Sequence, residues 1–149
     1  FLHTLTGGRI AIAGLSVGVA QACLDASLSY ARERKAFGKP ISQFQAIQFK
    51  LADMALEVEL ARLLTYRAAT AYMASSEPGG ELTKLAAMAK LYASETSKRA
   101  ADQAVQIHGG YGFIEDYPVA RYYRDVKINE IGEGTSEVQR MLIARELGV

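Results

Sequence analysis

Apolar residues recur at intervals of three and four along most of the chain. Between Ser42 and Met73 this interval joins Ile47, Leu51, Met54, Val58 and Ala61. Such a spacing puts the apolar side chains on one face of an α-helix, which completes a turn every 3.6 residues. The same reasoning predicts four main helices and a short extra one: Gly8–Arg34, Ser42–Met73, Leu82–His108, Val119–Asp125 and Ser136–Leu147.

Glycine and proline mark the breaks between these segments. The first helix is expected to stop near Gly38–Pro40, the second at Ser75–Gly80, and the third at Gly109–Gly110, because these residues interrupt helices. No segment alternates convincingly between apolar and polar residues with a period of two.

The last helix has signals at both ends. Ser136 and Gln139 have the spacing of a capping box, and Gly148 suits the C-terminal end. The whole pattern predicts an all-α fold, an antiparallel up-and-down four-helix bundle with a short extra helix.

Composition narrows the kind of protein. A chain of 149 residues is one domain by length, and its net charge of +1 gives no support to binding of nucleic acid or a membrane surface. The uncharged stretch Ile10–Leu24 is shorter than the ~20 residues that a membrane helix needs. Because the chain opens on Phe1 without a methionine, we expect it to be a piece of a longer protein.

Metal binding is not expected. The two histidines, His3 and His108, are far apart and have no metal-ligand spacing with Cys23, the single cysteine. A single cysteine also excludes an internal disulfide.

The segment around Glu133 permits two interpretations. Gly132 and Gly134 flank this glutamate directly before a helix start. An acidic residue there favours the helix dipole, which would be a purely structural role. A carboxylate between two glycines is also a candidate general base, provided that a ligand expels its water and raises its pKa.

Two other segments also carry a structural and a binding interpretation. The motif HGGYGF, His108–Phe113, lacks a preceding strand and is therefore not a dinucleotide fingerprint. It is interpreted as a helix C-cap followed by a turn, with His108 as a packing or capping residue and the glycine backbone open to a phosphate or a ring. The cations of Arg32–Gln45 suit a helix C-terminus. An arginine there can also form a bidentate hydrogen bond to a phosphate beside the flat ring of Phe37.

Three segments together resemble a known family. In order and spacing, ERKAFGKPISQFQAIQFKLADM, AVQIHGGYGF and RDVKINEIGEGTSEVQR are similar to the C-terminal helical domain of the acyl-CoA dehydrogenases. The likeness extends over essentially the whole chain. The family also has an N-terminal helical domain and a middle β domain, which residues 1–149 do not contain.

The resemblance implies FAD as cofactor and α,β-dehydrogenation of an acyl-CoA thioester. Glu133 matches the glutamate that takes the α-proton while the β-hydrogen leaves as hydride to the flavin. One branch of the family carries that glutamate on the first helix instead, directly before the residue that matches Arg9. Here that position is Gly8, so Glu133 has no rival.

The resemblance also implies binding roles for ten further residues. The residues expected to contact the FAD of a neighbouring subunit are Arg34, Phe37, Gln45, Gln106, Gly109 and Gly110. Thr135 and Glu137 are expected to flank the nearer FAD, Gly134 to contact the substrate through its backbone, and Arg9 to contact the CoA portion. Thr6 stands where many members carry an acidic residue, three positions before the arginine that matches Arg9, and this departure concerns the CoA contact. Gly132 stands where many members have a bulky aromatic residue, so acyl length and branching are left open.

The implied partners are an acyl-CoA substrate, further copies of the chain in a dimer or tetramer, and electron-transfer flavoprotein as acceptor. The implied location is the cytoplasm of a bacterium or the mitochondrial matrix of a eukaryote, and the isolated chain is expected to be inactive.

Two alternative functions stay open. One is a related flavoprotein oxidase, and a nitroalkane oxidase would carry aspartate in place of Glu133. The other is a non-catalytic bundle for assembly or nucleic-acid binding.

Overall fold

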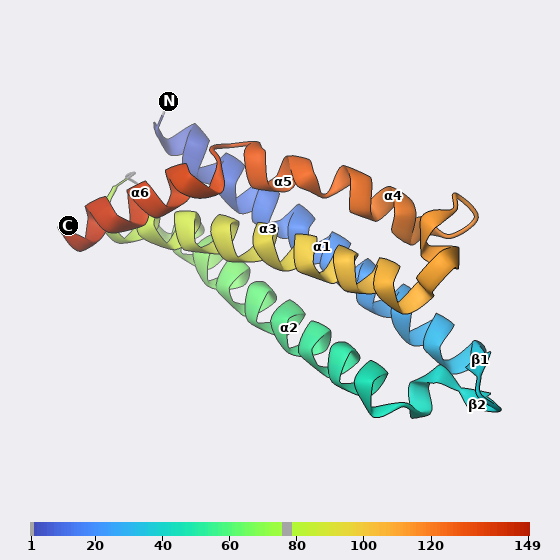
Figure 1. Ribbon diagram of the computed structural model, residues 1–149. Coiled ribbons are helices and arrows are strands. Elements are labelled where there is room, and N and C mark those ends of the chain that lie inside the picture. Colours follow the sequence, from blue (N-terminus) through green and yellow to red (C-terminus); the bar gives the residue numbers. More distant parts are fainter. Residues whose placement is uncertain (1, 76–78) are drawn as a thin grey trace.

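The computed structural model describes residues 2–75 and 79–149. In this part of the chain three long helices are followed by a fourth, segmented one, and successive members run in opposite directions (Figure 1). The helices are α1 (Leu2–Glu33), α2 (Gln45–Ala74), α3 (Gly80–His108), α4 (Pro118–Asp125), α5 (Lys127–Ile131) and α6 (Ser136–Leu147). The predicted all-α, up-and-down bundle is confirmed. The predicted break at Ser75–Gly80 lies partly outside the described residues.

Helix α3 is the centre of the bundle and packs against α1, α2 and α6. Its buried face is built from small residues, among them Ala86, Ala89, Ala93, Ala100 and Ala104. Small side chains let neighbouring helix axes approach closely, which fills the interior without large residues. The predicted stripe of α2 is confirmed, since Met54, Val58 and Ala61 are buried there.

Helix α1 is apolar for a reason that the packing explains. Its portion Leu5–Glu33 is long and apolar enough to cross a membrane by length and composition alone. Ala13, Ala20 and Cys23 of this portion are fully buried, and α1 runs along both α2 and α3. The role of a core helix in the bundle therefore accounts for its composition.

A tight hairpin, which the sequence pattern does not predict, follows α1. Strand β1 (Lys35–Ala36) pairs antiparallel with β2 (Lys39–Pro40). Between them Phe37 and Gly38 have φ of 51° and 81°, the positive values of a two-residue hairpin turn. Strands of two residues are too short to show an alternating pattern. The hairpin also ends α1 one residue earlier than predicted.

The prediction for the C-terminal segments is correct for the bounds of α6 but not for its N-terminal cap or for helix α5 (Lys127–Ile131). Helix α6 begins at Ser136 as predicted, and Gly148 ends it in the left-handed conformation with φ 83°. The capping-box prediction is wrong, because the side chain of Thr135 accepts the cap hydrogen bond from the backbone N–H of Val138 at 3.4 Å. Helix α5, with five residues, was not predicted.

Candidate active site

Glu133 lies in the turn that joins α5 to α6, and its backbone is left-handed with φ 56°. This conformation costs a residue with a Cβ on the order of 1 kcal/mol, so other interactions must hold the turn. Gly134 follows with φ 95°, and a Cβ added to it would lie 2.7 Å from Nε2 of Gln139. Both the backbone angle and the available space therefore require glycine at position 134.

Two fully buried side chains hold this turn. Lys90 on α3 donates from Nζ to the backbone oxygen of Glu130 at 3.1 Å and to that of Gly134 at 2.7 Å. Gln139 on α6 donates from Nε2 to the backbone oxygen of Glu133 at 3.1 Å and to that of Gly134 at 2.9 Å. The carbonyl of Gly134 thus accepts two hydrogen bonds, which occupies both of its lone pairs.

The carboxylate of Glu133 lies beside Gly8 on α1. A Cβ added to Gly8 would be 2.5 Å from Oε2 of Glu133 and 2.7 Å from its Cδ. The missing side chain of Gly8 therefore leaves the space that the carboxylate occupies. Glu133 is also solvent-exposed. Its backbone is held by Lys90 and Gln139, whereas its carboxylate stays open to a ligand.

Arg9 brings a buried positive charge close to this carboxylate. Its side chain is 8% exposed, and burial lowers the pKa of the guanidinium, while Glu133 raises it and Arg145 lowers it. Among the described residues, Nε of Arg9 is buried without a hydrogen-bond partner. A buried donor of this kind costs free energy unless something satisfies it. Arg9 therefore offers a charge and an unused N–H next to Glu133.

The buried ammonium of Lys90 sits among several charges. Burial lowers its pKa most, the carboxylates of Glu130, Glu133 and Glu137 raise it, and Arg9 lowers it. Because the ammonium donates to two backbone oxygens at the end of α5 and the start of α6, it is hydrogen-bonded as a buried charge must be.

Thr135 and Glu137 stand at the start of α6, directly after the turn. Thr135 is the N-cap residue, and Glu137 is exposed in the first turn of the helix. The pKa of Glu137 is lowered first by a hydrogen bond from its own backbone N–H and then by one from the Thr135 hydroxyl. These two predicted site residues therefore lie within four positions of Glu133 in the sequence and on the same turn-helix junction.

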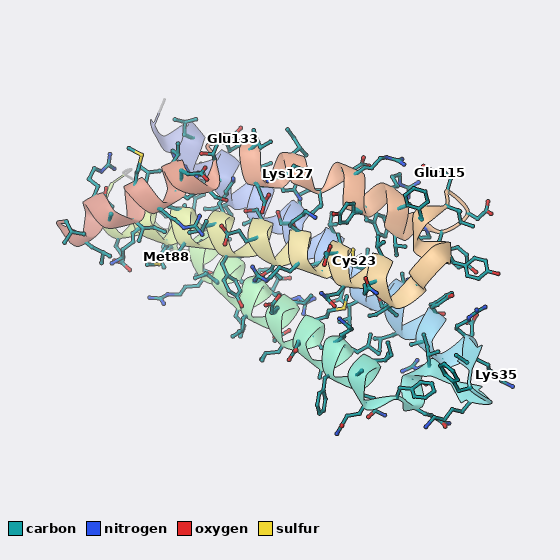
Figure 2. The ribbon with its side chains drawn as sticks, viewed as in Figure 1. Cys23, Lys35, Met88, Glu115, Lys127 and Glu133 are labelled. Atoms are coloured by element: carbon teal, nitrogen blue, oxygen red, sulfur yellow. The ribbon has the colours of Figure 1, made fainter. Side chains whose placement is uncertain are left out.

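The other predicted cofactor residues gather at the opposite end of the molecule. Figure 2 shows Glu133 and Lys35 near opposite ends of the bundle. Along α1, 24 residues separate Arg9 from Glu33, which corresponds to roughly 36 Å at the helical rise. Arg34 and Phe37 thus cannot join Glu133 in one site on one chain.

At that distant end the side chains form a shallow hollow of ≈ 500 Å³ lined by Tyr30, Arg34, Ile41, His108, Gly109, Gly110 and Tyr111, among others. The guanidinium of Arg34 lies 5.3 Å from the ring centroid of Tyr111. Gly109 has φ 58°, and added Cβ atoms on Gly109 and Gly110 would meet no atom within 4 Å. The glycine backbone is therefore open beside a cation and an aromatic ring.

The remaining predicted residues of this end are also accessible. Phe37 at the hairpin tip is 97% exposed, and Gln45 and Gln106 are exposed as well. His108 is instead buried and stacks on Tyr30 at 4.2 Å between ring centroids. The interpretation of His108 as a packing residue is confirmed, as is that of Gly109 as the C-cap of α3.

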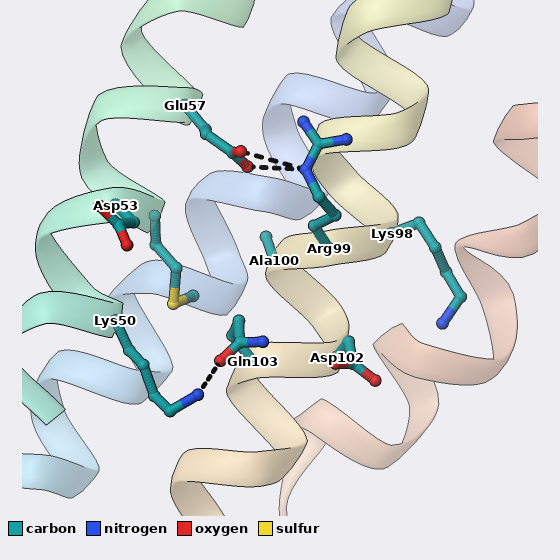
Figure 3. Close-up of a pocket in the computed structure, with 9 residues that line it drawn as sticks. Lys50, Asp53, Glu57, Lys98, Arg99, Ala100, Asp102 and Gln103 are labelled. Carbon is teal, nitrogen blue, oxygen red and sulfur yellow. Dashed lines mark hydrogen bonds and ion pairs between the residues drawn. The ribbon is translucent and has the colours of Figure 1, made fainter. Parts of the chain in front are cut away.

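A second hollow of ≈ 480 Å³ lies between α2 and α3 (Figure 3). In it Lys50 donates to the side-chain oxygen of Gln103, and Glu57 forms an ion pair with Arg99 at 3.1 Å. No predicted site residue is among its described lining residues. This hollow is therefore separate from both groups of predicted residues.

Comparison with known proteins decides the family. The family model for the C-terminal domain of acyl-CoA dehydrogenase matches residues 1–148. The chain belongs to the acyl-CoA dehydrogenase family. Members of this family are flavoproteins, and FAD-dependent dehydrogenation is their general activity.

Individual relatives are similar over almost the whole chain. The protein named "Probable acyl-CoA dehydrogenase YngJ" of Bacillus subtilis (strain 168) is 60% identical over 147 residues, which is 99% of this chain and 38% of the relative. The caffeyl-CoA reductase-Etf complex subunit CarC of Acetobacterium woodii is 50% identical over 143 residues, 96% of this chain and 37% of the relative.

The structure of butyryl-CoA dehydrogenase from Megasphaera elsdenii superposes with a TM-score of 0.94 at 47% identity. The match covers 99% of this chain and 38% of that one. The chain thus spans less than two fifths of the length of these acyl-CoA dehydrogenase relatives.

Two residues of the candidate site were not predicted from the sequence in their observed role. Lys90 lies four residues after Ala86 and three before Ala93, on the buried face of α3. A lysine on an apolar helical stripe needs an internal partner, and that spacing was the available signal. The spacing predicts Gln139 as half of a capping box, but its amide donates to the turn that carries Glu133.

Proposed function

We propose that these residues are the C-terminal domain of an FAD-dependent acyl-CoA dehydrogenase, with Glu133 as the α-proton base. The observation that carries this proposal is the placement of the Glu133 carboxylate, on a fixed left-handed turn, beside Gly8 and exposed to a ligand. No side chain at position 8 competes for that space. Arg9 adds a buried positive charge beside this carboxylate.

In the proposed reaction a carboxylate oxygen of Glu133 takes the proton from the α-carbon of the thioester. The electron pair of that C–H bond forms the α,β double bond as the β-hydrogen leaves with its own pair. FAD, when bound, supplies the acceptor for that hydride. A substrate covering Glu133 would expel water from around the carboxylate and bring it within hydrogen-bond reach of the proton that it removes.

The residues present fit a flavin dinucleotide at two places. Next to Glu133, the positive end of the α6 helix dipole favours a negatively charged group, and Thr135 stands at that end as the N-cap residue. At the far end Arg34, the ring of Tyr111 and the open backbone of Gly109 and Gly110 combine donors for phosphate with flat apolar surface. Because roughly 36 Å of helix lies between the two places, we assign the far end to the FAD of a neighbouring subunit.

We propose a homo-oligomer, a dimer or a tetramer, since such a shared cofactor requires at least two copies. An acyl-CoA is the proposed substrate and electron-transfer flavoprotein the proposed electron acceptor. The relative from Acetobacterium woodii is named as a subunit of an Etf complex, which supports that choice of acceptor.

The test uses the full-length, FAD-loaded enzyme and a panel of acyl-CoAs that begins with butyryl-CoA. Bleaching of the flavin absorbance without oxygen, together with formation of the enoyl-CoA, is the expected result. If no member of the panel reduces the flavin, the proposed reaction is wrong. Rapid consumption of oxygen by the reduced enzyme would identify an oxidase instead.

A further inference from the structure

We propose that Lys90 and Gln139 are positioning residues for the base, acting through the backbone of the turn that carries Glu133. Together these two side chains form a donor clamp. The proposal rests on the assignment of Glu133 as the base and names the groups that fix its geometry. Neither residue reaches the substrate in this scheme, because within residues 2–75 and 79–149 their side chains donate to backbone oxygens of Glu130, Glu133 and Gly134.

Lys90 ties the end of one helix to the start of the next. Its Nζ bonds the carbonyl of Glu130 in the last turn of α5 and the carbonyl of Gly134 directly before the N-cap of α6. The carbonyls in the last turn of a helix have no partner within the helix, and a cation there also suits the helix dipole. The lysine therefore fixes both ends of the segment that contains Glu133.

Gln139 approaches the same turn from α6. Its Nε2 bonds the carbonyls of Glu133 and Gly134, so Gly134 accepts one hydrogen bond from each member of the clamp. Its Oε1 is buried without a partner in the described part of the chain. The amide is thus held by its donor side alone, which is the side that faces the turn.

The geometry of the turn explains why a clamp is needed. Glu133 and Gly134 both have positive φ, at 56° and 95°, and a non-glycine residue leaves that region readily when nothing holds it. A relaxed turn would rotate the side chain of Glu133 away from Gly8. A base displaced by about 1 Å from the reacting C–H can lose on the order of 100-fold in rate. The clamp therefore controls the rate of proton removal rather than the affinity for substrate.

The donor clamp is tested in the full-length, FAD-loaded enzyme with Lys90→Met and Gln139→Leu. Each change removes the donor and keeps a side chain of similar length or volume in the interior. We expect the limiting rate of flavin reduction by butyryl-CoA to fall roughly 10–100-fold. The Kd of butyryl-CoA, taken from the concentration dependence of that rate, should change by less than about threefold. The isotope effect with α-deuterated butyryl-CoA should increase, because proton removal becomes slower than the other steps.

A matched control removes a different lysine hydrogen bond. Lys50→Met deletes the contact from Lys50 to Gln103 in the hollow between α2 and α3 (Figure 3), and the limiting rate should stay at the wild-type value. The double variant Lys90→Met with Gln139→Leu should lose less than the product of the two single losses, because both donors serve Gly134.

Three results would overturn the donor clamp: wild-type rates per bound FAD in both single variants, a loss confined to the Kd, or an unchanged isotope effect. If Lys90→Met does not fold, Gln139→Leu alone decides between these results and the expected one. Glu133→Gln, measured in parallel, separates the two proposals. Normal reduction by Glu133→Gln would remove the base assignment itself, whereas its loss beside active clamp variants would reject only the clamp.

Discussion

The carboxylate of Glu133 occupies the space that a side chain at position 8 would fill, 2.5 Å from an added Cβ on Gly8. The two residues lie 125 positions apart in the sequence (133 − 8) and come from the turn before α6 and from α1. The carboxylate of Glu133 can occupy this position only if the residue at position 8 of α1 is very small. The absence of a side chain at Gly8 is part of the candidate site.

Replacing Gly8 with alanine should separate stability from activity. The nearest atoms to the new methyl group belong to the flexible end of Glu133, which can move aside at little cost. Alanine also favours a helix by about 1 kcal/mol over glycine. We expect the Gly8→Ala bundle to melt at the wild-type temperature or above it, while the FAD-loaded enzyme loses roughly 10-fold or more in flavin reduction. A Gly14→Ala variant, where an added Cβ meets no atom within 4 Å, is the control and should keep its activity.

Glu133→Gln should keep the shape of the site and remove its base. The amide is isosteric with the carboxylate but does not accept the α-proton. FAD content and acyl-CoA binding should be retained, while the rate of flavin reduction falls by about 10²–10⁴-fold. Stopped-flow reduction measures this directly. A rate near that of the wild type would assign the proton to another residue.

His108 should make the stability of the bundle depend on pH. Burial lowers the pKa of His108, and the hydrogen bond to the Ala104 carbonyl only partly opposes this. As the pH falls below the ordinary histidine value of about 6.5, the unfolded chain takes up a proton that the folded chain does not. The free energy of unfolding should therefore decrease through this window.

His108→Phe keeps a ring against Tyr30 and removes the titrating group. Urea unfolding of the 149-residue chain at a series of pH values should show a weaker decrease for this variant than for the wild type. His3 is present in both proteins and cancels in the comparison. Parallel curves would mean that His108 titrates in the folded protein as it does in the unfolded one.

Self-association should depend on one face of α2. Four exposed apolar side chains fall within a narrow stripe of this helix: Phe49, Leu56, Leu60 and Leu63. Covering such a stripe with a second copy removes apolar surface from water. We expect Leu56→Glu with Leu60→Glu to lower the mass that light scattering reports for the full-length protein. Met73→Glu, also exposed but outside the stripe, should leave that mass unchanged. Equal masses for all three proteins would place the contact elsewhere.

The isolated chain should be folded, colourless and inactive. Its core is formed by its own helices. The two groups of residues predicted to contact FAD lie at opposite ends of the bundle, and each group is open to solvent on one side. Affinity depends on enclosed, preorganised contact. Circular dichroism checks the folding, the visible spectrum after purification checks the colour, and an assay with butyryl-CoA checks the activity. A flavin band at one FAD per chain would show that these residues hold the cofactor unaided.

The long helices could be predicted from the sequence because their apolar residues recur with the helical period, as those of α2 do at Met54, Val58 and Ala61. The hairpin at Lys35–Pro40 and the short helix α5 could not, since neither is long enough to establish a period. The cap of α6 was misplaced by one residue because Thr135 and Ser136 are equally suited to it by type.

One part of the candidate site could also be predicted from the sequence, and another part could not. Glu133 stood out through its neighbouring glycines, whereas Lys90 reaches it from 43 positions away (133 − 90), and only the packing of α3 against the turn brings them together.

Helix α1 runs without interruption from Leu2 to Glu33, so it sets the distance between the two ends of the molecule as well as forming part of the core. Both ends of this helix carry predicted ligand contacts, and no loop lies between Arg9 and Glu33 to absorb a change in length. A single inserted residue would turn one end relative to the other by about 100° and lengthen the helix by about 1.5 Å. The two ends would then no longer face their ligands together. Helix α1 is therefore a rigid spacer, and the number of its residues determines the distance and the angle between the two proposed FAD sites.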